Sequence, residues 1–154
     1  MIIENIKLTE IVEAGNLIKK VFDESAAEDY TSAGIRHFYE KISESAIRER
    51  FSNGSMIIVA KADNRISGYL EITNSNHIYL LFVKKEDQHK GIGRKLIEFS
   101  LNLLRENDSE LYNVTVNSTE SAVKLYEKLG FVRLADCQYK NDMISYPMSI
   151  VIRY

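Results

Sequence analysis

The first third of the chain combines one short strand-like segment with hydrophobic positions at helical spacing. Residues 2–7 are predicted to form the strand. Beyond them, apolar side chains recur three or four positions apart, first at Ile11, Leu17, Ile18, Val21 and Phe22, then at Ile35, Phe38, Tyr39 and Ile42. Because this spacing gathers side chains on one face of a helix, it predicts a first helix here and a second helical region from about Thr31 through Phe51, closed by Gly54.

The middle of the chain changes to a β-type pattern. Three runs rich in β-branched and aromatic residues, SMIIVAKA, RISGYLEIT and HIYLLFV, are separated by turn-forming residues at 63–64 and 74–76. Runs joined by such short turns are typical of an antiparallel meander. Helical spacing returns after Lys90 and ends near Asn107. The remaining segments are predicted as a strand at 111–116, a short helix at 121–129 and two strands around 133–140 and 144–152.

This order of elements predicts a single α+β, or mixed α/β, domain that spans residues 1–154. We expect a largely antiparallel, twisted sheet of about seven strands with helices packed against it. The strand at 77–83, the helix after it and the strand at 111–116 form a crossover, which makes those two strands candidate parallel neighbours. In such units ligands bind where the carboxyl end of a strand meets the entrance of the next helix.

Composition and charge argue against several classes of partner. The 20 Lys and Arg against 22 Asp and Glu give a formal net charge of −2, so no overall positive field favours nucleic acid. No segment combines a basic start with a long apolar run, so we expect no secretion, no membrane association and a cytoplasmic location. Cys137 is the single cysteine, and His37 and His89 lack carboxylate or thiol neighbours at ligand spacing, so no metal site is predicted.

The stretch QHKGIGRK, residues 88–95, lies between the last strand of the meander and the helix that follows. Glycine lets the backbone approach a ligand closely, and the first turn of a helix offers amides that lack an intrahelical acceptor. Together these features favour phosphate. A P-loop would require four residues between its glycines and then Lys and Ser or Thr, and a dinucleotide-binding fingerprint would require a third glycine at Leu96, so neither motif is present.

The pattern that remains, Gln88, two residues, Gly91, one residue and Gly93, resembles the signature of the GNAT superfamily of acyl-CoA-dependent N-acyltransferases. The similarity extends over residues 55–131. HIYLLFVKKEDQHKGIGRKLIEF resembles the family's cofactor strand, loop and helix, AVKLYEKLGF resembles its second cofactor region, and Gly68 also matches. The first 50 residues and the tail match only in the predicted order of elements. The resemblance implies a GNAT-like fold whose parallel strand pair borders the cofactor cleft.

The resemblance also implies which groups bind acetyl-CoA. Backbone amides of the loop would bind the pyrophosphate, and this loop comprises Gln88, His89, Lys90, Gly91, Ile92, Gly93 and Arg94. Side chains of Lys90, Arg94 and Lys95 could add charge-assisted contacts to phosphate. The strand at 77–83 would be splayed from its parallel partner, so that the pantetheine arm and the thioester oxygen are held by the main chain of Leu81, Phe82 and Val83. Asn117 matches a cofactor-contacting asparagine of many members, and three residues before Glu120 it equally matches a helix cap.

Acyl transfer to an amine needs a base for the ammonium proton and an acid for the departing thiolate. Tyr126 matches the tyrosine that many family members use as this acid, and it also belongs to an i, i+3, i+4, i+7 apolar stripe, which is the pattern of a core position. The candidate bases are His77, at the start of the cofactor strand, and Glu71, near the end of the preceding strand, with Glu71 alternatively orienting His77. A turn histidine and an exposed strand-end glutamate are the structural alternatives.

The resemblance implies transfer of an acetyl or other short acyl group from acyl-CoA to a primary amine. Direct attack, which needs no enzyme nucleophile, is expected and suits a chain that has no G-x-S-x-G motif. The alternative is a non-enzymatic acetyl-CoA-binding sensor or interaction module.

The acceptor, a small molecule or a peptide, is weakly encoded. The acidic segment 23–30 would attract a cationic amine, and solvated helix ends explain the same acids. Pro147 indicates a sheet edge that either pairs with a second copy, giving a homodimer, or is protected from pairing by the proline.

Overall fold

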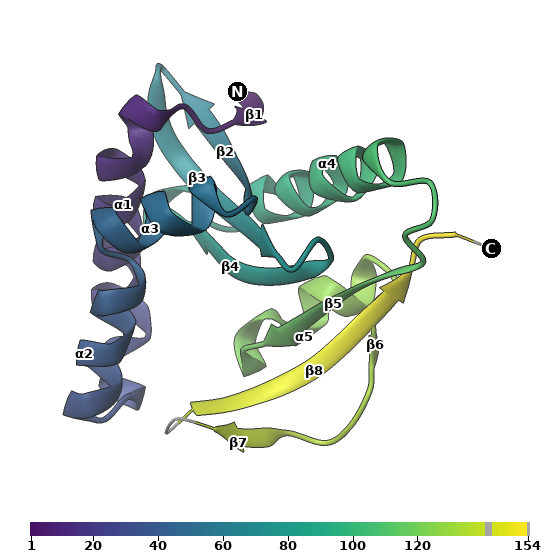
Figure 1. The fold of residues 1–154 in the computed structure, drawn as a ribbon. Coiled ribbons are helices and arrows are strands. Elements are labelled where there is room, and N and C mark those ends of the chain that lie inside the picture. The colour runs from purple at the N-terminus through teal and green to yellow at the C-terminus, as the bar shows by residue number, and fades with distance from the viewer. Residues whose placement is uncertain (141–142, 154) are drawn as a thin grey trace.

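The computed structural model describes residues 1–140 and 143–153 and shows one mixed sheet with helices on both faces (Figure 1). The helices are α1 (Ile11–Ser25), α2 (Ser32–Lys41), α3 (Glu44–Ser52), α4 (Ile92–Asn107) and α5 (Val123–Lys128). The strands are β1 (Ile2–Asn5), β2 (Met56–Ala62), β3 (Arg65–Thr73), β4 (His77–Val83), β5 (Asn113–Ser118), β6 (Val132–Arg133), β7 (Gln138–Lys140) and β8 (Met143–Val151). The mixed α/β class is confirmed.

The sheet runs in the order β1-β2-β3-β4-β5-β8-β6, with β7 paired to β8. Every pair is antiparallel except β4 with β5, so the meander and the parallel pair predicted from the crossover are both confirmed. At the first meander turn, Asp63 and Asn64 have positive φ values of 51° and 62°, a backbone conformation that these residue types tolerate.

Two predicted segments are divided in the structure. The helical region predicted over 31–51 is broken after α2, because Ser43 begins a new helix and its hydroxyl accepts a hydrogen bond from the Ala46 amide at 3.2 Å. The strand predicted around 133–140 forms two short strands, β6 and β7, separated by residues 134–137, which are not part of a strand. The sheet therefore has eight strands where about seven were expected.

The prediction of a sheet edge at Pro147 is wrong, since β8 lies between β5 and β6. Pro147 pairs with Asn117 of β5, and its carbonyl accepts a hydrogen bond from the Leu134 amide at 2.8 Å. The N–H and C=O of a strand residue point to the same side, so the N–H that Pro147 lacks would face Leu134, the first residue after β6, and its absence fits the end of the β6 ladder there. A second copy therefore has no free edge to pair with at Pro147.

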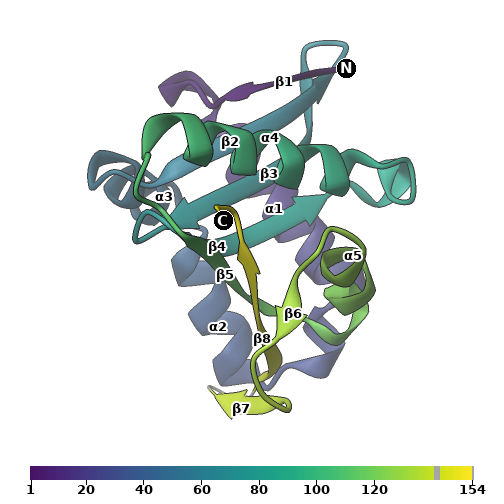
Figure 2. The ribbon, with the colours of Figure 1, turned by 90° about the vertical axis from the view of Figure 1, so that its right-hand side faces the viewer.

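The helices divide between the two faces of the sheet (Figure 2). Buried side chains of α4 and α5 join one hydrophobic cluster with Ile58, Leu70 and Val114, and buried side chains of α1, α2 and α3 join another with Ile57 and Tyr69. The central strands contribute to both clusters because alternate side chains point to opposite faces. Helices therefore cover both faces of the sheet that contains β4 and β5.

β4 is paired with β3 from His77 to Val83 but with β5 only at its start. Its first two residues pair in parallel with β5, and in the described chain the pairing of these strands ends there. On the other side, the register with β3 shifts between Glu71 and Ile72, which leaves Tyr79 as an extra residue in a β-bulge. A bulge bends the strand that contains it. β4 and β5 consequently separate from Tyr79 onward.

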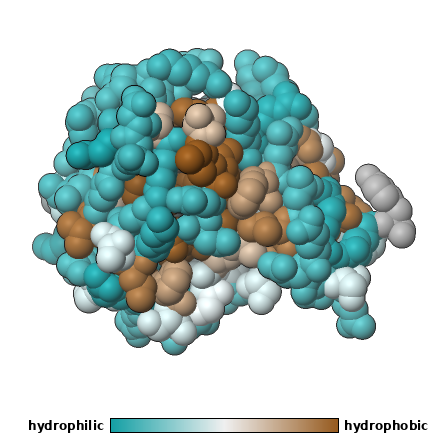
Figure 3. All heavy atoms as spheres, turned by 90° about the horizontal axis from the view of Figure 1, so that it is seen from above, coloured by the Kyte–Doolittle hydropathy of each residue, from teal (hydrophilic) through white to brown (hydrophobic). Residues whose placement is uncertain are grey.

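The face of the molecule seen from above is mainly hydrophilic (Figure 3). Seen from above, hydrophilic side chains surround a smaller hydrophobic area (Figure 3). Among the helices of residues 1–140 and 143–153, none combines the length and the hydropathy that a membrane span requires. Within the same residues, no group of three or more His, Cys, Asp or Glu side chains could hold a metal ion.

Candidate active site

The loop between β4 and α4 presents a run of backbone amides without an acceptor. Within the described residues, none of the amides from His89 to Arg94 donates a hydrogen bond, whereas the next amide, that of Lys95, donates to the Gly91 carbonyl at 3.1 Å. The first turn of a helix leaves such groups free, and the helix dipole makes this end partially positive. The loop thus offers a row of donors suited to a diphosphate.

Two residues of this loop have left-handed backbone conformations, which bend the chain next to the free amides. His89 has a φ of 63° and Gly91 has a φ of 85°, an angle that glycine adopts without steric cost. A Cβ atom added at Gly91 would meet no other atom within 4 Å, so the space beside it is open. A Cβ atom added at Gly93 would make an ordinary contact of 3.5 Å with Leu125. The two glycines therefore keep side-chain bulk away from the free amides.

Close packing fixes the entrance of α4 against the sheet. A Cβ atom added at Gly68 would lie 2.9 Å from Leu96 Cδ1 and 3.0 Å from Ile92 Cγ2, so glycine is needed for this approach. The Ile92 side chain is buried in this contact, which leaves only its amide for a ligand. Gln88 Nε2 donates to the Val83 carbonyl at 3.0 Å and ties the loop to the end of β4.

The basic side chains of the loop are paired with acids. Lys90 Nζ donates to Asp87 Oδ1 at 3.0 Å, and Arg94 Nε donates to Glu98 Oε1 at 2.8 Å. Such exposed pairs contribute little to stability, so either cation can exchange its carboxylate for a phosphate. Asp87 also accepts a hydrogen bond from the Ser67 hydroxyl at 2.8 Å, and the hydrogen bonds from Ser67 and Lys90 lower the pKa of Asp87. The sequence shows Asp87 within the basic run 84–95, but its pattern did not single out this anion as a site residue.

The main chain of residues 81–83 lies beyond the bulge. One side of this segment pairs with β3, and the other side faces the region where β5 has diverged. Backbone groups of a strand alternate between its two sides, so part of them point into the gap. Leu81 and Val83 pack on the α4 side of the sheet, and Phe82 packs on the α1 side. The position of these residues suits an extended, amide-containing arm.

Tyr126 packs its ring in the core and presents its hydroxyl at the surface of that core. Its ring centroid lies 5.2 Å from that of Phe131 in an edge-to-face contact, and the residue is 2% exposed. Within the described residues its hydroxyl makes no hydrogen bond, yet no fully buried polar side-chain atom lacks a partner, so the hydroxyl retains contact with solvent. Burial raises the pKa of Tyr126, which keeps the phenol protonated. Both sequence interpretations, core residue and proton donor, are compatible with this placement.

His77 is the first residue of β4 and begins its short parallel pairing with β5. It pairs with Thr115 of β5, and its Nδ1 atom lies 2.8 Å from the Thr115 hydroxyl oxygen. Burial lowers the pKa of His77 below its ordinary value of 6.5, so the neutral imidazole predominates at pH 7. A neutral imidazole with one nitrogen held by a hydroxyl group can accept a proton at the other nitrogen.

Glu71 is buried, contrary to the exposed position expected for a strand-end glutamate. Its side chain has no exposed surface, and its oxygens accept hydrogen bonds from Arg50 Nε at 2.6 Å, Arg50 Nη2 at 3.2 Å and the Tyr69 hydroxyl at 2.8 Å. These contacts enclose the carboxylate on the α3 side of the sheet. They leave Glu71 without access to a substrate amine. The expected contact with His77 is also wrong, because Thr115 takes that role.

Asn117 is part of β5 and does not cap a helix. The cap position of the following 3₁₀ helix, Glu120–Ala122, is occupied by Thr119. The Asn117 side chain is exposed, and two residues after Thr115 it lies on the same face of the sheet. A contact between Asn117 and the cofactor stays a prediction.

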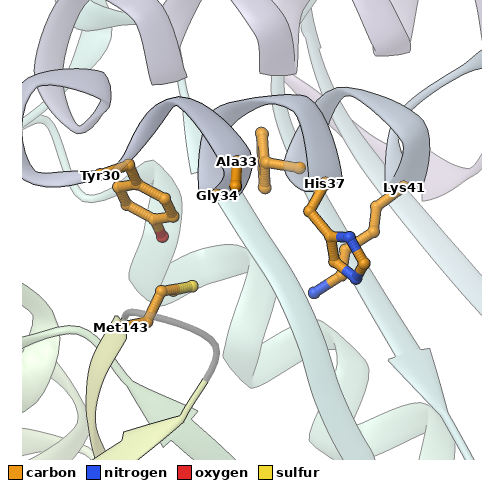
Figure 4. Close-up of a pocket in the computed structure, with 7 residues that line it drawn as sticks. Tyr30, Ala33, Gly34, His37, Lys41 and Met143 are labelled. Atoms are coloured by element: carbon orange, nitrogen blue, oxygen red, sulfur yellow. The ribbon is translucent and has the colours of Figure 1, made fainter.

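A pocket of about 160 Å³ lies between α2 and the start of β8 (Figure 4). The residues around it are Tyr30, Ala33, Gly34, His37, Phe38, Lys41 and Met143. Lys41 Nζ lies 5.8 Å from the centroid of the Tyr79 ring, so the pocket borders the bulged part of β4. The sequence pattern did not predict this pocket. Its local trace is the spacing of four positions between His37 and Lys41, which places both side chains on the same face of α2.

Relatives of known structure share this fold. A GCN5-related N-acetyltransferase, "Aminotransferase, Class-II", from Rhodopseudomonas palustris superimposes with a TM-score of 0.82 at 16% identity, covering 97% of this chain and 94% of that one. The PaiA N-acetyltransferase of Thermoplasma acidophilum, solved in complex with coenzyme A, gives a TM-score of 0.80 at 17% identity, covering 98% and 99% of the two chains. At these identities the likeness concerns the fold.

Sequence comparison extends this result. An uncharacterized N-acetyltransferase in the pepI 3′ region of Lactobacillus delbrueckii subsp. lactis is 25% identical over 132 residues, which cover 77% of this chain and 76% of that protein. The model of the acetyltransferase (GNAT) domain matches residues 26–152, which is most of the chain. With this match, the free amides before α4 and the splayed β4–β5 pair, the chain belongs to the GNAT family of acetyl-CoA-dependent N-acetyltransferases.

Proposed function

We propose that the protein transfers an acetyl or other short acyl group from acyl-CoA to a primary amine of a small molecule or peptide, by direct attack and without a covalent enzyme intermediate. The observation that supports this most is the run of free amides from His89 to Arg94 directly beside the unpaired edge of β4. The open space beside Gly91 and the extended edge fit a diphosphate followed by a narrow arm. Bound acyl-CoA would supply an activated thioester.

The loop and β4 would position this co-substrate. Amides from His89 to Arg94 would bind the diphosphate, with Lys90 and Arg94 turning from their present carboxylate partners toward it. Main-chain groups of residues 81–83 would hold the arm and polarise the thioester carbonyl. Fixed donors of this kind lose no energy in reorganising when charge develops.

His77 and Tyr126 would carry the two proton transfers. An alkyl ammonium has a pKa of about 10.4, so the acceptor must lose a proton before it attacks. Neutral His77 would take that proton, directly or through water. Tyr126, kept protonated by burial, would donate its hydroxyl proton to the departing sulfur.

The acceptor would enter on the face of α1, α2 and α3. The pocket around His37 and Lys41 lies on this face and borders Tyr79. Part of the acidic segment 23–30 is already engaged, since Asp23 accepts a hydrogen bond from the Tyr39 hydroxyl. The pull of this segment on a cationic amine is therefore weaker than its sequence implies.

Two assays test the proposed function. Acetyl-CoA should raise the melting temperature, because a ligand at about 1,000 times its dissociation constant adds about 4 kcal/mol to stability. Free thiol should then be released when a panel of primary amines is added. A melting shift without thiol release for any amine would identify a sensor or interaction module, and the absence of any shift would contradict acyl-CoA binding itself.

A further inference from the structure

Next to the bulge in β4, side chains of β3 and α3 and a backbone carbonyl of α2 form a connected set of hydrogen bonds. Glu71 is the one ionisable side chain among the buried polar residues of the described chain. Its carboxylate accepts hydrogen bonds from the Tyr69 hydroxyl on the same strand and from the guanidinium of Arg50 on α3. Arg50 Nη1 also donates to the carbonyl of Lys41, at the end of α2, at 2.7 Å. Arg50 is thereby fixed in one orientation by acceptors on two elements.

The fixed guanidinium lies against the bulged residue. Arg50 Cζ is 5.0 Å from the centroid of the Tyr79 ring, within the range of a cation–π contact. Tyr79 is the residue that the register shift between Glu71 and Ile72 leaves without a partner on β3. An unpaired residue in a bulge keeps its position only when its surroundings hold it. Arg50 holds the ring of Tyr79 at the point where β4 leaves β5.

Stability alone does not account for this ion pair. A buried pair loses the hydration of both charges, and apolar residues of the same volume are often equally stable. The planar fork of arginine, however, can bind both oxygens of Glu71 and stack on Tyr79 at once, which the single ammonium of lysine cannot do. The geometry therefore matches a requirement for orientation.

We propose that Arg50, oriented by Glu71, Tyr69 and the Lys41 carbonyl, is a positioning residue that holds the Tyr79 bulge and so keeps the β4 main chain open for the pantetheine arm. This role rests on the proposed function, since the arm belongs to acyl-CoA. The proposal divides the acyl-CoA site into a part that binds the diphosphate and a part that binds the arm. The loop from His89 to Arg94 binds the diphosphate independently of the bulge, whereas the arm depends on it.

Two ligands distinguish these parts. Acetyl-CoA carries both the diphosphate and the arm, and 3′-phosphoadenosine 5′-diphosphate carries only the diphosphate end. Their dissociation constants are measured by isothermal titration calorimetry for the wild type, Arg50→Lys and Tyr79→Leu. Arg48→Lys is the matched control, because Arg48 lies on the same helix in an exposed pair with Glu44 at 3.0 Å.

We expect Arg50→Lys to weaken acetyl-CoA binding at least about tenfold, or about 1.4 kcal/mol, and to change binding of the truncated nucleotide less than about twofold. Tyr79→Leu should act in the same way, because it removes the ring and leaves the Arg50–Glu71 pair intact. If Arg50→Lys does not fold, the two dissociation constants of Tyr79→Leu test the positioning role by themselves. Arg48→Lys should leave both constants unchanged.

Equal weakening of both ligands, or unchanged acetyl-CoA binding in both site variants, would overturn the positioning role while the proposed function stands. If the wild type binds neither ligand, the proposed function fails and the role of Arg50 falls with it. The wild-type titration therefore distinguishes failure of the proposed function, in which neither ligand binds, from failure of the positioning role, in which both ligands bind the wild type.

Discussion

Replacing Tyr126 by phenylalanine separates its role in packing from its role in catalysis. The change removes one oxygen atom and keeps the ring that packs edge-to-face on Phe131. No hydrogen bond within the described residues is lost, and a typical hydrogen bond contributes about 1 kcal/mol. The free energy of unfolding should therefore change by less than about 1 kcal/mol, which corresponds to a melting shift below about 4 °C for a chain of this size.

The effect on turnover should be much larger. A positioned general acid contributes roughly 10²- to 10⁴-fold to a rate, so kcat for free-thiol release should fall by at least about 10²-fold in Tyr126→Phe. The assay uses the amine with the highest wild-type rate, and calorimetry should give an acetyl-CoA dissociation constant within about twofold of the wild type. Equal kcat values for the two proteins would refute the role of Tyr126 as the acid.

Tyr69→Phe is the structural counterpart of this experiment. The Tyr69 hydroxyl donates to buried Glu71 at 2.8 Å, and hydrogen bonds to charged groups contribute about 1.5–3 kcal/mol. Tyr69→Phe should therefore lower stability clearly, unlike Tyr126→Phe. A similar loss of stability in both variants would show that the Tyr126 hydroxyl is part of the packed core.

Three further predictions concern the strands and the loop. Gly68→Ala places a Cβ atom 2.9 Å from Leu96 and should cost about 1–3 kcal/mol in denaturant unfolding; an unchanged midpoint would contradict the close packing. Burial lowers the pKa of His77, so the unfolded chain binds this proton more tightly than the folded chain, and the free energy of unfolding should fall as the pH drops below about 6.5. The His77→Gln variant should lose less stability than the wild type between pH 7 and pH 5. An identical loss in the two proteins would contradict the pKa shift. Asp87→Asn removes an anion beside the loop and frees Lys90 from its ion pair. Calorimetry at low salt should therefore show acetyl-CoA binding that is about two- to tenfold tighter than in the wild type. Weaker binding would show that Asp87 instead supports the loop structure.

Features that depend on short stretches of sequence were predicted well. The meander follows from apolar runs and turn residues such as Asp63 and Asn64, which have positive φ values in the structure. The loop after β4 was recognisable because its chemistry resides in the backbone, and glycine at position 91 marks a conformation that other residues adopt with strain. Local geometry of this kind requires no knowledge of distant contacts.

The bulge at Tyr79 was not predictable from the pattern. A regular strand shows its two faces by alternation, but HIYLLFV is apolar at every position after His77, so one inserted residue leaves no trace. Glu71 and Arg50 were equally hidden. Their pairing joins positions 21 residues apart, and Arg50 is one of several charged residues in α3. The sequence therefore located the phosphate loop but missed the ion pair beneath the cleft.

The break between α2 and α3 had a local signal that was outweighed by periodicity. Ser43 is a preferred capping residue, and its hydroxyl binds the Ala46 amide. The apolar spacing nevertheless continues across the break, since Ile42 and Ile47 are both buried in the same cluster. Hydrophobic period alone therefore predicted one long helical region.

A two-dimensional ¹⁵N NMR titration with acetyl-CoA tests the central claim most directly, because it reports on each backbone amide. Binding of the diphosphate by the loop predicts that the amides from His89 to Arg94 shift most strongly and saturate together, followed by those of residues 81–83, while amides around the exposed Arg48 side chain on α3 do not shift. Saturable binding in which the His89 to Arg94 amides do not shift, with the largest changes elsewhere in the chain, would contradict it.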